Sequence, residues 1–171
     1  MPVKDLPTPI KPNSGFSILE LLIVLLIIAT VSGYAVVTYM HTQANLARNE
    51  AALRFAIALE KAQHDSARRR NALPEQMAYV KVIDSRNYSL SIDGNGDGLI
   101  DSPVVTTLPD IHSMMIKGPF PKYLRFDWLG RAVDKTGEIV EPPLVTFATG
   151  RRTSMIKLES GSKPQVVYGE D

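Results

Sequence analysis

A long apolar run near the N-terminus constrains this chain more than any other feature. Across residues 16–40 the only charged residue is Glu20, and residues 21–29 are aliphatic without interruption. A helix of this length spans about 37 Å at a rise of about 1.5 Å per residue, and about 20 apolar residues suffice to cross a bilayer. The run therefore predicts a membrane-spanning helix.

The segment before the run differs from an ordinary secretory signal. Such a signal has a short apolar region of about 7–15 residues, followed by a cleavage site of small residues. Here residues 1–15 are polar, with prolines at positions 2, 7, 9 and 12 that disfavour a helix. We expect the helix to begin near Phe16 or Ser17.

Glu20 is the informative residue of the run. A carboxylate at the centre of a membrane helix costs roughly 2.5–3.5 kcal/mol on insertion scales, and such residues are usually functional. One explanation places Glu20 near the helix N-terminus, where the dipole stabilises an acid and the side chain reaches the interface. The other gives it a positive partner, such as a freed α-amino group on Phe16 of a neighbouring copy. The residues alone leave both open.

Residues 15–24, Gly-Phe-Ser-Ile-Leu-Glu-Leu-Leu-Ile-Val, closely resemble the processing motif of type IV pilins and type II secretion pseudopilins. The resemblance implies that a prepilin peptidase cleaves after Gly15 and that Phe16 is N-methylated. It implies that Glu20 neutralises a neighbour's N-terminus during assembly with other pilin or pseudopilin subunits. It also implies a single-pass protein of the bacterial inner membrane, whose C-terminal domain is extracytoplasmic (periplasmic) until the subunit joins a pilus or pseudopilus.

After residue 40 the sequence becomes amphipathic. Apolar residues recur at spacings of four, four, four and three, the period of a helix with one buried face: Ala47, Ala51, Phe55, Leu59 and Ala62. Leu53 and Ile57 flank this stripe. The helix is expected to continue to about Arg69, before Asn71 and Pro74. The organisation is thus a leader (1–15), a transmembrane and assembly helix (16–40), its amphipathic half (41–72) and a domain over 73–171.

The domain over 73–171 has the pattern of an antiparallel β structure. Alternating or β-rich segments bounded by turn residues predict strands at 77–83, 88–92, 104–108, 111–116, 123–126, 144–148, 154–158 and 165–168. The fold class is therefore α+β, with a long N-terminal helix packed on a C-terminal β-rich domain, the pilin fold. Three segments are similar to the GspH/FimT group of pseudopilins: residues 126–132 (Phe-Asp-Trp-Leu-Gly-Arg-Ala), 144–147 and 155–158.

Many major pilins carry a proline at the position of Val36 and Val37, and this chain has none there. That difference and the second resemblance both favour a minor pilin or pseudopilin. The machine it would serve, in secretion, twitching or DNA uptake, is open. The alternative is a FimT-like DNA-binding minor pilin. Its candidate contacts are basic residues, chiefly Arg68, Arg69, Arg70, Arg151 and Arg152. For residues 68–70 the competing interpretation is a set of cations that complements the helix dipole.

An acidic glycine loop at residues 93–101 has oxygen side chains at alternate positions, as in calcium loops. Its candidate ligands for Ca²⁺ are Asp93, Asn95, Asp97 and Asp101. The twelfth position of the EF-hand pattern would be Val104 instead of a bidentate Glu, and the flanks are predicted strands. The competing interpretation is a plain β-hairpin tip, because Asn-Gly and Asp-Gly favour positive φ.

Charge and composition limit the function classes. Of 19 basic and 18 acidic residues, residues 1–15 hold two and one, so the remaining chain has 17 of each. That balance lacks the global basic excess typical of nucleic-acid binding. The chain has no cysteine, which excludes disulfides, thiol catalysis and cysteine-ligated zinc. No phosphate loop, HExxH or GxSxG motif is present, so we expect a structural subunit and not an enzyme.

Overall fold

The computed structural model describes residues 16–70, 73–110, 113–119, 122–141, 144–159 and 162–169. The predicted leader with Gly15 lies outside the described residues, as do Asn71 and the first two residues of the strand predicted at 111–116. The chain divides into two compact units, Met1–Met40 and His41–Asp171.

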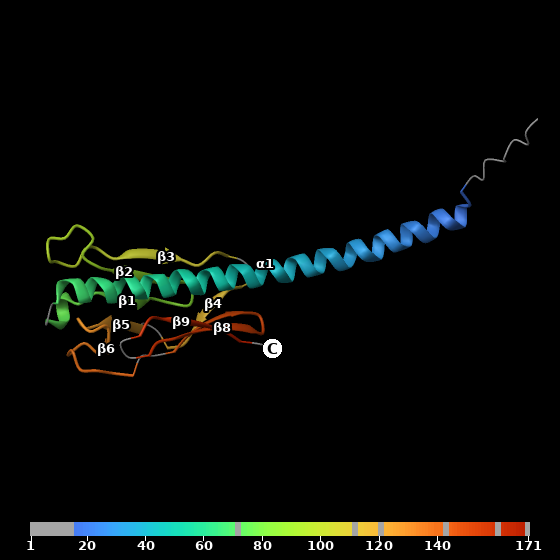
Figure 1. Ribbon diagram of the computed structural model, residues 1–171. Coiled ribbons are helices and arrows are strands. Elements are labelled where there is room, and N and C mark those ends of the chain that lie inside the picture. Colours follow the sequence, from blue (N-terminus) through green and yellow to red (C-terminus); the bar gives the residue numbers. More distant parts are fainter. Residues whose placement is uncertain are drawn as a thin grey trace, which may run out of the picture. The chain divides into compact units, whose positions relative to one another are not determined.

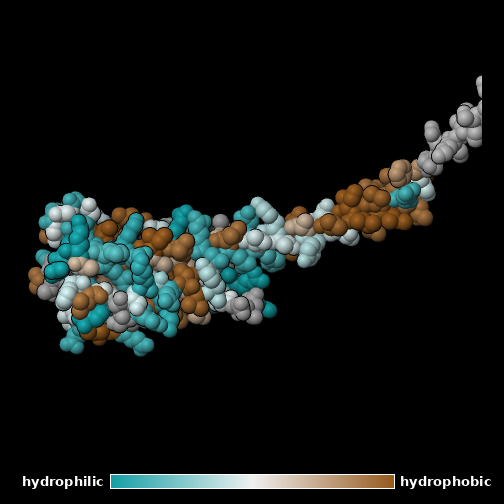
Figure 2. All heavy atoms as spheres, in the orientation of Figure 1, coloured by the Kyte–Doolittle hydropathy of each residue, from teal (hydrophilic) through white to brown (hydrophobic). Residues whose placement is uncertain are grey.

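Helix α1 (Ile18–Arg69) is continuous, as the sequence predicts, and it extends through both units (Figure 1). Every residue from 16 to 40 is exposed, and Figure 2 shows apolar side chains covering this part of the helix. Two of its threonine hydroxyls are satisfied within the helix, since Thr30 Oγ1 donates to the carbonyl of Ile27 at 2.9 Å and Thr38 Oγ1 to that of Tyr34 at 3.0 Å. By length and composition this segment can cross a membrane, where backbone and side-chain polar groups must be satisfied internally.

In the second unit the described residues form two antiparallel sheets. The first sheet has the order β3-β2-β1-β5-β6, with β1 (Tyr79–Val82), β2 (Asn87–Ser91), β3 (Val104–Thr107), β5 (Lys122–Phe126) and β6 (Ala132–Val133). The second has the order β4-β7-β8-β9, with β4 (Met115–Lys117), β7 (Val145–Thr149), β8 (Arg152–Lys157) and β9 (Gln165–Tyr168). A short 3-10 helix, η1 (Pro74–Gln76), follows α1.

The α+β layout is confirmed, and each predicted strand overlaps a strand of the structure. Strand β6 was not predicted. It has two residues, Ala132 and Val133, which is too short for an alternating pattern, and it exists because it pairs with the end of β5. The predicted helical stripe is buried from Ala51 to Ala62.

One side chain joins the helix to both sheets. Phe55 of α1 is fully buried, and its ring meets Tyr88 of β2 edge-on at 4.9 Å and Phe147 of β7 at 5.6 Å between centroids. Such edge-to-face pairs add about 0.5–1.5 kcal/mol beyond the area they bury. Within this unit α1 lies alongside both sheets (Figure 1). The rest of the core is mostly aliphatic, with Phe126 as a further buried ring, and it includes Leu59, Val80, Val82, Leu124, Val145 and Ile156.

Candidate functional site

The candidate assembly site is the start of α1. Ser17 caps the helix, because its Oγ accepts from the amide of Leu19 at 3.3 Å and its carbonyl accepts from Leu21 at 3.1 Å. This places Glu20 in the first turn, where the helix dipole favours a carboxylate. Phe16 and Glu20 are both exposed, and no residue in the described part of the chain forms an ion pair or hydrogen bond with Glu20. The carboxylate is therefore available to a group from outside the chain.

A second apolar surface lies on the part of α1 that packs on the sheets. Leu46, Leu53 and Ile57 are 59%, 51% and 44% exposed. At 3.6 residues per turn, Leu53 and Ile57 each lie about 160° around the helix from buried Phe55. They are therefore not flanks of the buried stripe, as the sequence suggested, but the opposite face. We call Leu46, Leu53 and Ile57 the outward stripe.

The N-terminal region matches a family model described as the prokaryotic N-terminal methylation motif, over residues 10–36. The chain carries a type IV pilin-like N-terminal signal. This type IV pilin-like precursor combines the signal with a long apolar helix and a β domain. No curated protein matches the chain, and no solved structure does.

The acidic glycine loop of this pilin-like precursor is attached to the end of α1. Asp65, which the sequence analysis did not single out, accepts from Arg69 Nε at 2.9 Å, from Arg68 Nη2 at 3.1 Å and from the amide of Asp93 at 3.2 Å. Arg68 Nη2 also donates to the carbonyl of Asp93 at 2.8 Å, and Arg69 Nη1 to that of Gly98 at 3.5 Å. The i+3 and i+4 spacing of the two arginines after Asp65 was the sequence signal for this network.

Asp93 organises the loop itself. Its Oδ1 accepts from the amide of Gly96 at 2.6 Å and its Oδ2 from that of Gly98 at 2.9 Å. Burial raises the pKa of Asp93, but these two amides and the charges of Arg68 and Arg69 outweigh burial and hold the pKa below its usual value. Gly96 and Gly98 have φ of 83° and 87°, as the hairpin interpretation predicts.

The candidate calcium ligands are engaged with the loop. Asp101 Oδ2 accepts from the amide of Gly94 at 2.8 Å, and Asn95 Nδ2 donates to Asp97 Oδ2 at 3.0 Å. Within the described ranges, no group of three or more His, Cys, Asp or Glu side chains could hold a metal ion. Calcium binding stays a prediction, and calorimetry with calcium on the full chain tests it: absence of both heat and a shift in melting temperature would contradict it.

The five arginines predicted as DNA contacts fall at two ends of the second unit. Arg68 and Arg69 end α1 and Arg70 follows it, whereas residues 151–152 lie at the β7–β8 turn. Near that turn, Ser154 Oγ accepts from Nε of Arg48 at 2.9 Å. Arg48 precedes residue 68 by 20 helical residues, which is about 30 Å. The arginines therefore do not form one patch, because the length of α1 separates the two groups.

DNA binding through these residues stays a prediction. Arg69 has a side chain only 7% exposed and lies 2.7 Å from Asp65 Oδ2, so its charge is matched within the chain. A gel shift with the full chain at low and moderate salt tests the prediction, since phosphate-driven binding weakens as salt rises.

Proposed function

We propose that this chain is a minor pilin or pseudopilin, a structural subunit of a type II secretion pseudopilus or a type IV pilus. The observation that carries the proposal is Glu20: a carboxylate within the pilin-like motif, in the first turn of an exposed apolar helix, without a partner among the described residues. A carboxylate in hydrocarbon is costly unless a cation meets it. The α-amino group that cleavage would free on Phe16 of a neighbouring copy is such a cation.

The outward stripe supports assembly through the same helix. Leu46, Leu53 and Ile57 expose apolar side chains on the face of α1 turned away from the sheets, beside the exposed charge of Glu50, although this part of the helix belongs to the second unit. Apolar surface that one copy exposes is favourable to bury against another, at about 25 cal/mol per Å². In the proposed filament, neighbouring helices cover both the residues 16–40 and this stripe.

Processing is the first step of the proposed pathway. A prepilin peptidase would cleave after Gly15 and N-methylate Phe16, and the C-terminal domain would stay extracytoplasmic (periplasmic) while residues 16–40 span the bacterial inner membrane. Intact-mass spectrometry of the mature protein should show a chain that begins at Phe16 and carries one methyl group. A mature chain that retains residues 1–15 would contradict the proposal.

The assembly role is tested by Glu20→Ala in the full chain. The variant should insert into the membrane and be processed as the original chain is, because it makes the helix more apolar, but it should not enter filaments. Glu159→Ala is the control, since Glu159 is an exposed carboxylate that lies outside α1 and away from both proposed assembly surfaces. Normal filament incorporation of Glu20→Ala, measured by shearing and immunoblotting, would show that the central step is wrong.

A further inference from the structure

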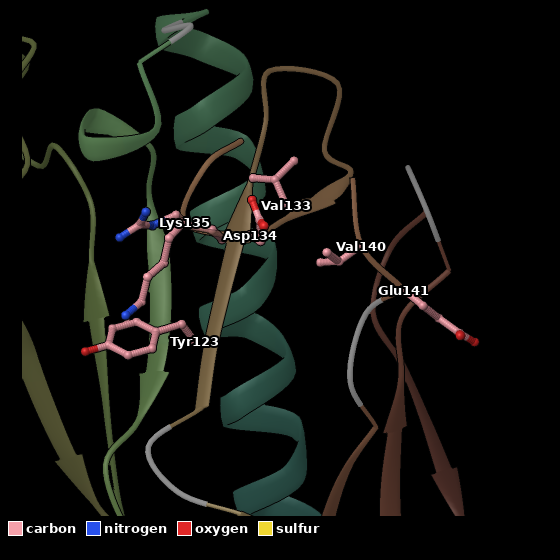
Figure 3. Close-up of a pocket in the computed structure, with 7 residues that line it drawn as sticks. Tyr123, Val133, Asp134, Lys135, Val140 and Glu141 are labelled. Carbon is pink, nitrogen blue, oxygen red and sulfur yellow. The ribbon is translucent and has the colours of Figure 1, made fainter. Parts of the chain in front are cut away.

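A pocket opens on the face of β5 that is turned away from α1. Leu124 and Phe126 point into the core, so by strand alternation Tyr123 and Arg125 point outward. The pocket has a volume of about 320 Å³, near the lower end of the range for small-molecule sites. It is lined by Tyr123, Arg125, Val133, Asp134, Lys135, Val140 and Glu141 (Figure 3).

Arg125 is the unusual residue of this pocket. Its Nε is buried and has no hydrogen-bond partner among the residues that the structure describes, and none of their carboxylates pairs with its guanidinium. The guanidinium carbon lies 5.5 Å from the ring centroid of Tyr79, which holds the group in place. A buried donor without an acceptor is costly, so an acceptor that enters the pocket would be favoured.

The charge that faces the pocket is mainly positive. The Nζ atoms of Lys81 and Lys135 lie 5.2 and 5.5 Å from the ring centroid of Tyr123, beside Arg125. Of the two acids that line the pocket, Asp134 is hydrogen-bonded within its own turn. Its Oδ1 accepts from the amide and hydroxyl of Thr136 and from the amide of Glu138. In Figure 3 the side chain of Glu141 points away from Tyr123 and Lys135. The pocket thus offers cations next to apolar and aromatic walls.

We propose that this pocket binds a carboxylate joined to an apolar group, with the carboxylate on Arg125 and the apolar part against Tyr123, Val133 and Val140. A guanidinium presents two parallel N–H donors that match a carboxylate. A polyanion fits less well, because Asp134 and Glu141 border the same pocket. The inference is independent of the proposed filament function.

Two sources could supply this chemistry. One is a free small carboxylic acid with an aromatic or aliphatic body. The other is an acidic side chain next to an apolar one on a polypeptide, and this chain itself presents such a segment at residues 97–101, where Leu99 is 59% exposed between Asp97 and Asp101. The two sources share the recognition chemistry and differ in what surrounds the carboxylate.

The test uses the full chain in detergent micelles and follows the arginine Nε–H signals by NMR. The probes are phenylacetate and a blocked Asp-Gly-Leu-Ile-Asp peptide, which is the sequence of residues 97–101. Saturable binding in the millimolar range or better, with a shift of the Arg125 Nε–H signal, is the expected result. Phenylacetamide is the neutral control and should bind at least tenfold more weakly than phenylacetate.

Variants separate the pocket from non-specific charge. Arg125→Gln should lower affinity at least tenfold, whereas Arg151→Gln, at the β7–β8 turn, should leave it unchanged. Binding of phenylacetate alone identifies a small acid as the source, and binding of the peptide alone identifies a polypeptide. If neither probe moves the Arg125 signal, or if phenylacetamide binds as well as phenylacetate, the proposal is overturned whatever the fate of the variants.

Discussion

Asp65→Ala should destabilise the second unit more than any surface change. The side chains of Asp65 and Arg69 are 6% and 7% exposed, and their closest N–O distance is 2.7 Å. Removing one partner of a buried ion pair costs about 3–5 kcal/mol, because the other charge is left buried without a counter-ion. Arg68 adds little, since its side chain is 58% exposed and water can solvate it. We expect a loss of about 3–4 kcal/mol in the free energy of unfolding.

The loss can be measured by urea unfolding of the full chain in micelles, followed by the fluorescence of Trp128, the only tryptophan. For a unit of this size a loss of about 3 kcal/mol corresponds to a fall of about 10 °C in melting temperature. Glu50→Ala is the control, because it breaks the Arg54–Glu50 pair, whose side chains are 67% and 61% exposed. Its expected cost is below about 0.5 kcal/mol.

The reasoning would be refuted if Asp65→Ala and Glu50→Ala had equal effects. A second variant checks the cause of the loss. Adding Arg69→Met to Asp65→Ala removes the orphaned buried charge and should recover part of the stability. No recovery would show that the cost comes from a source other than the uncompensated arginine.

Three further predictions follow from the same contacts. Because folding lowers the pKa of Asp93, the unfolded chain binds more protons in acid than the folded chain does. The contribution of Asp93 to stability is therefore full above the unfolded pKa of about 3.9 and is lost as the pH falls through the folded pKa. In urea unfolding, Asp93→Asn should lose less stability between pH 7 and pH 3 than the original chain. Phe55→Ala should cost about 3–5 kcal/mol in calorimetry, since the ring is fully buried between Tyr88 and Phe147; a cost below about 1 kcal/mol would contradict that packing. Ile57→Lys should change stability by less than about 0.5 kcal/mol but reduce filament incorporation in a shearing assay, and unchanged incorporation would remove the outward stripe from the assembly surface.

Features that depend on local chemistry and periodicity can be predicted from the order of the residues alone. The apolar run and Glu20 identify the helix and the pilin-like signal, because length and charge decide what can lie in a bilayer. The change of period from 3.6 to two separates the amphipathic half of α1 from the strands. These signals depend on residues a few positions apart, and the helix bounds and the overlapping strands of the structure agree with them.

Contacts between side chains that are distant in the sequence arise from the tertiary fold. It paired Arg68 and Arg69 of the predicted DNA contacts with Asp65 and placed Arg151 and Arg152 at the distant β7–β8 turn. It also turned Leu53 and Ile57 away from the sheets and brought Tyr79 next to Arg125. Such contacts join residues many positions apart, and neither periodicity nor motif spacing records them. Their energy depends on burial and partner geometry, which exist only once the strands have paired and packed on α1.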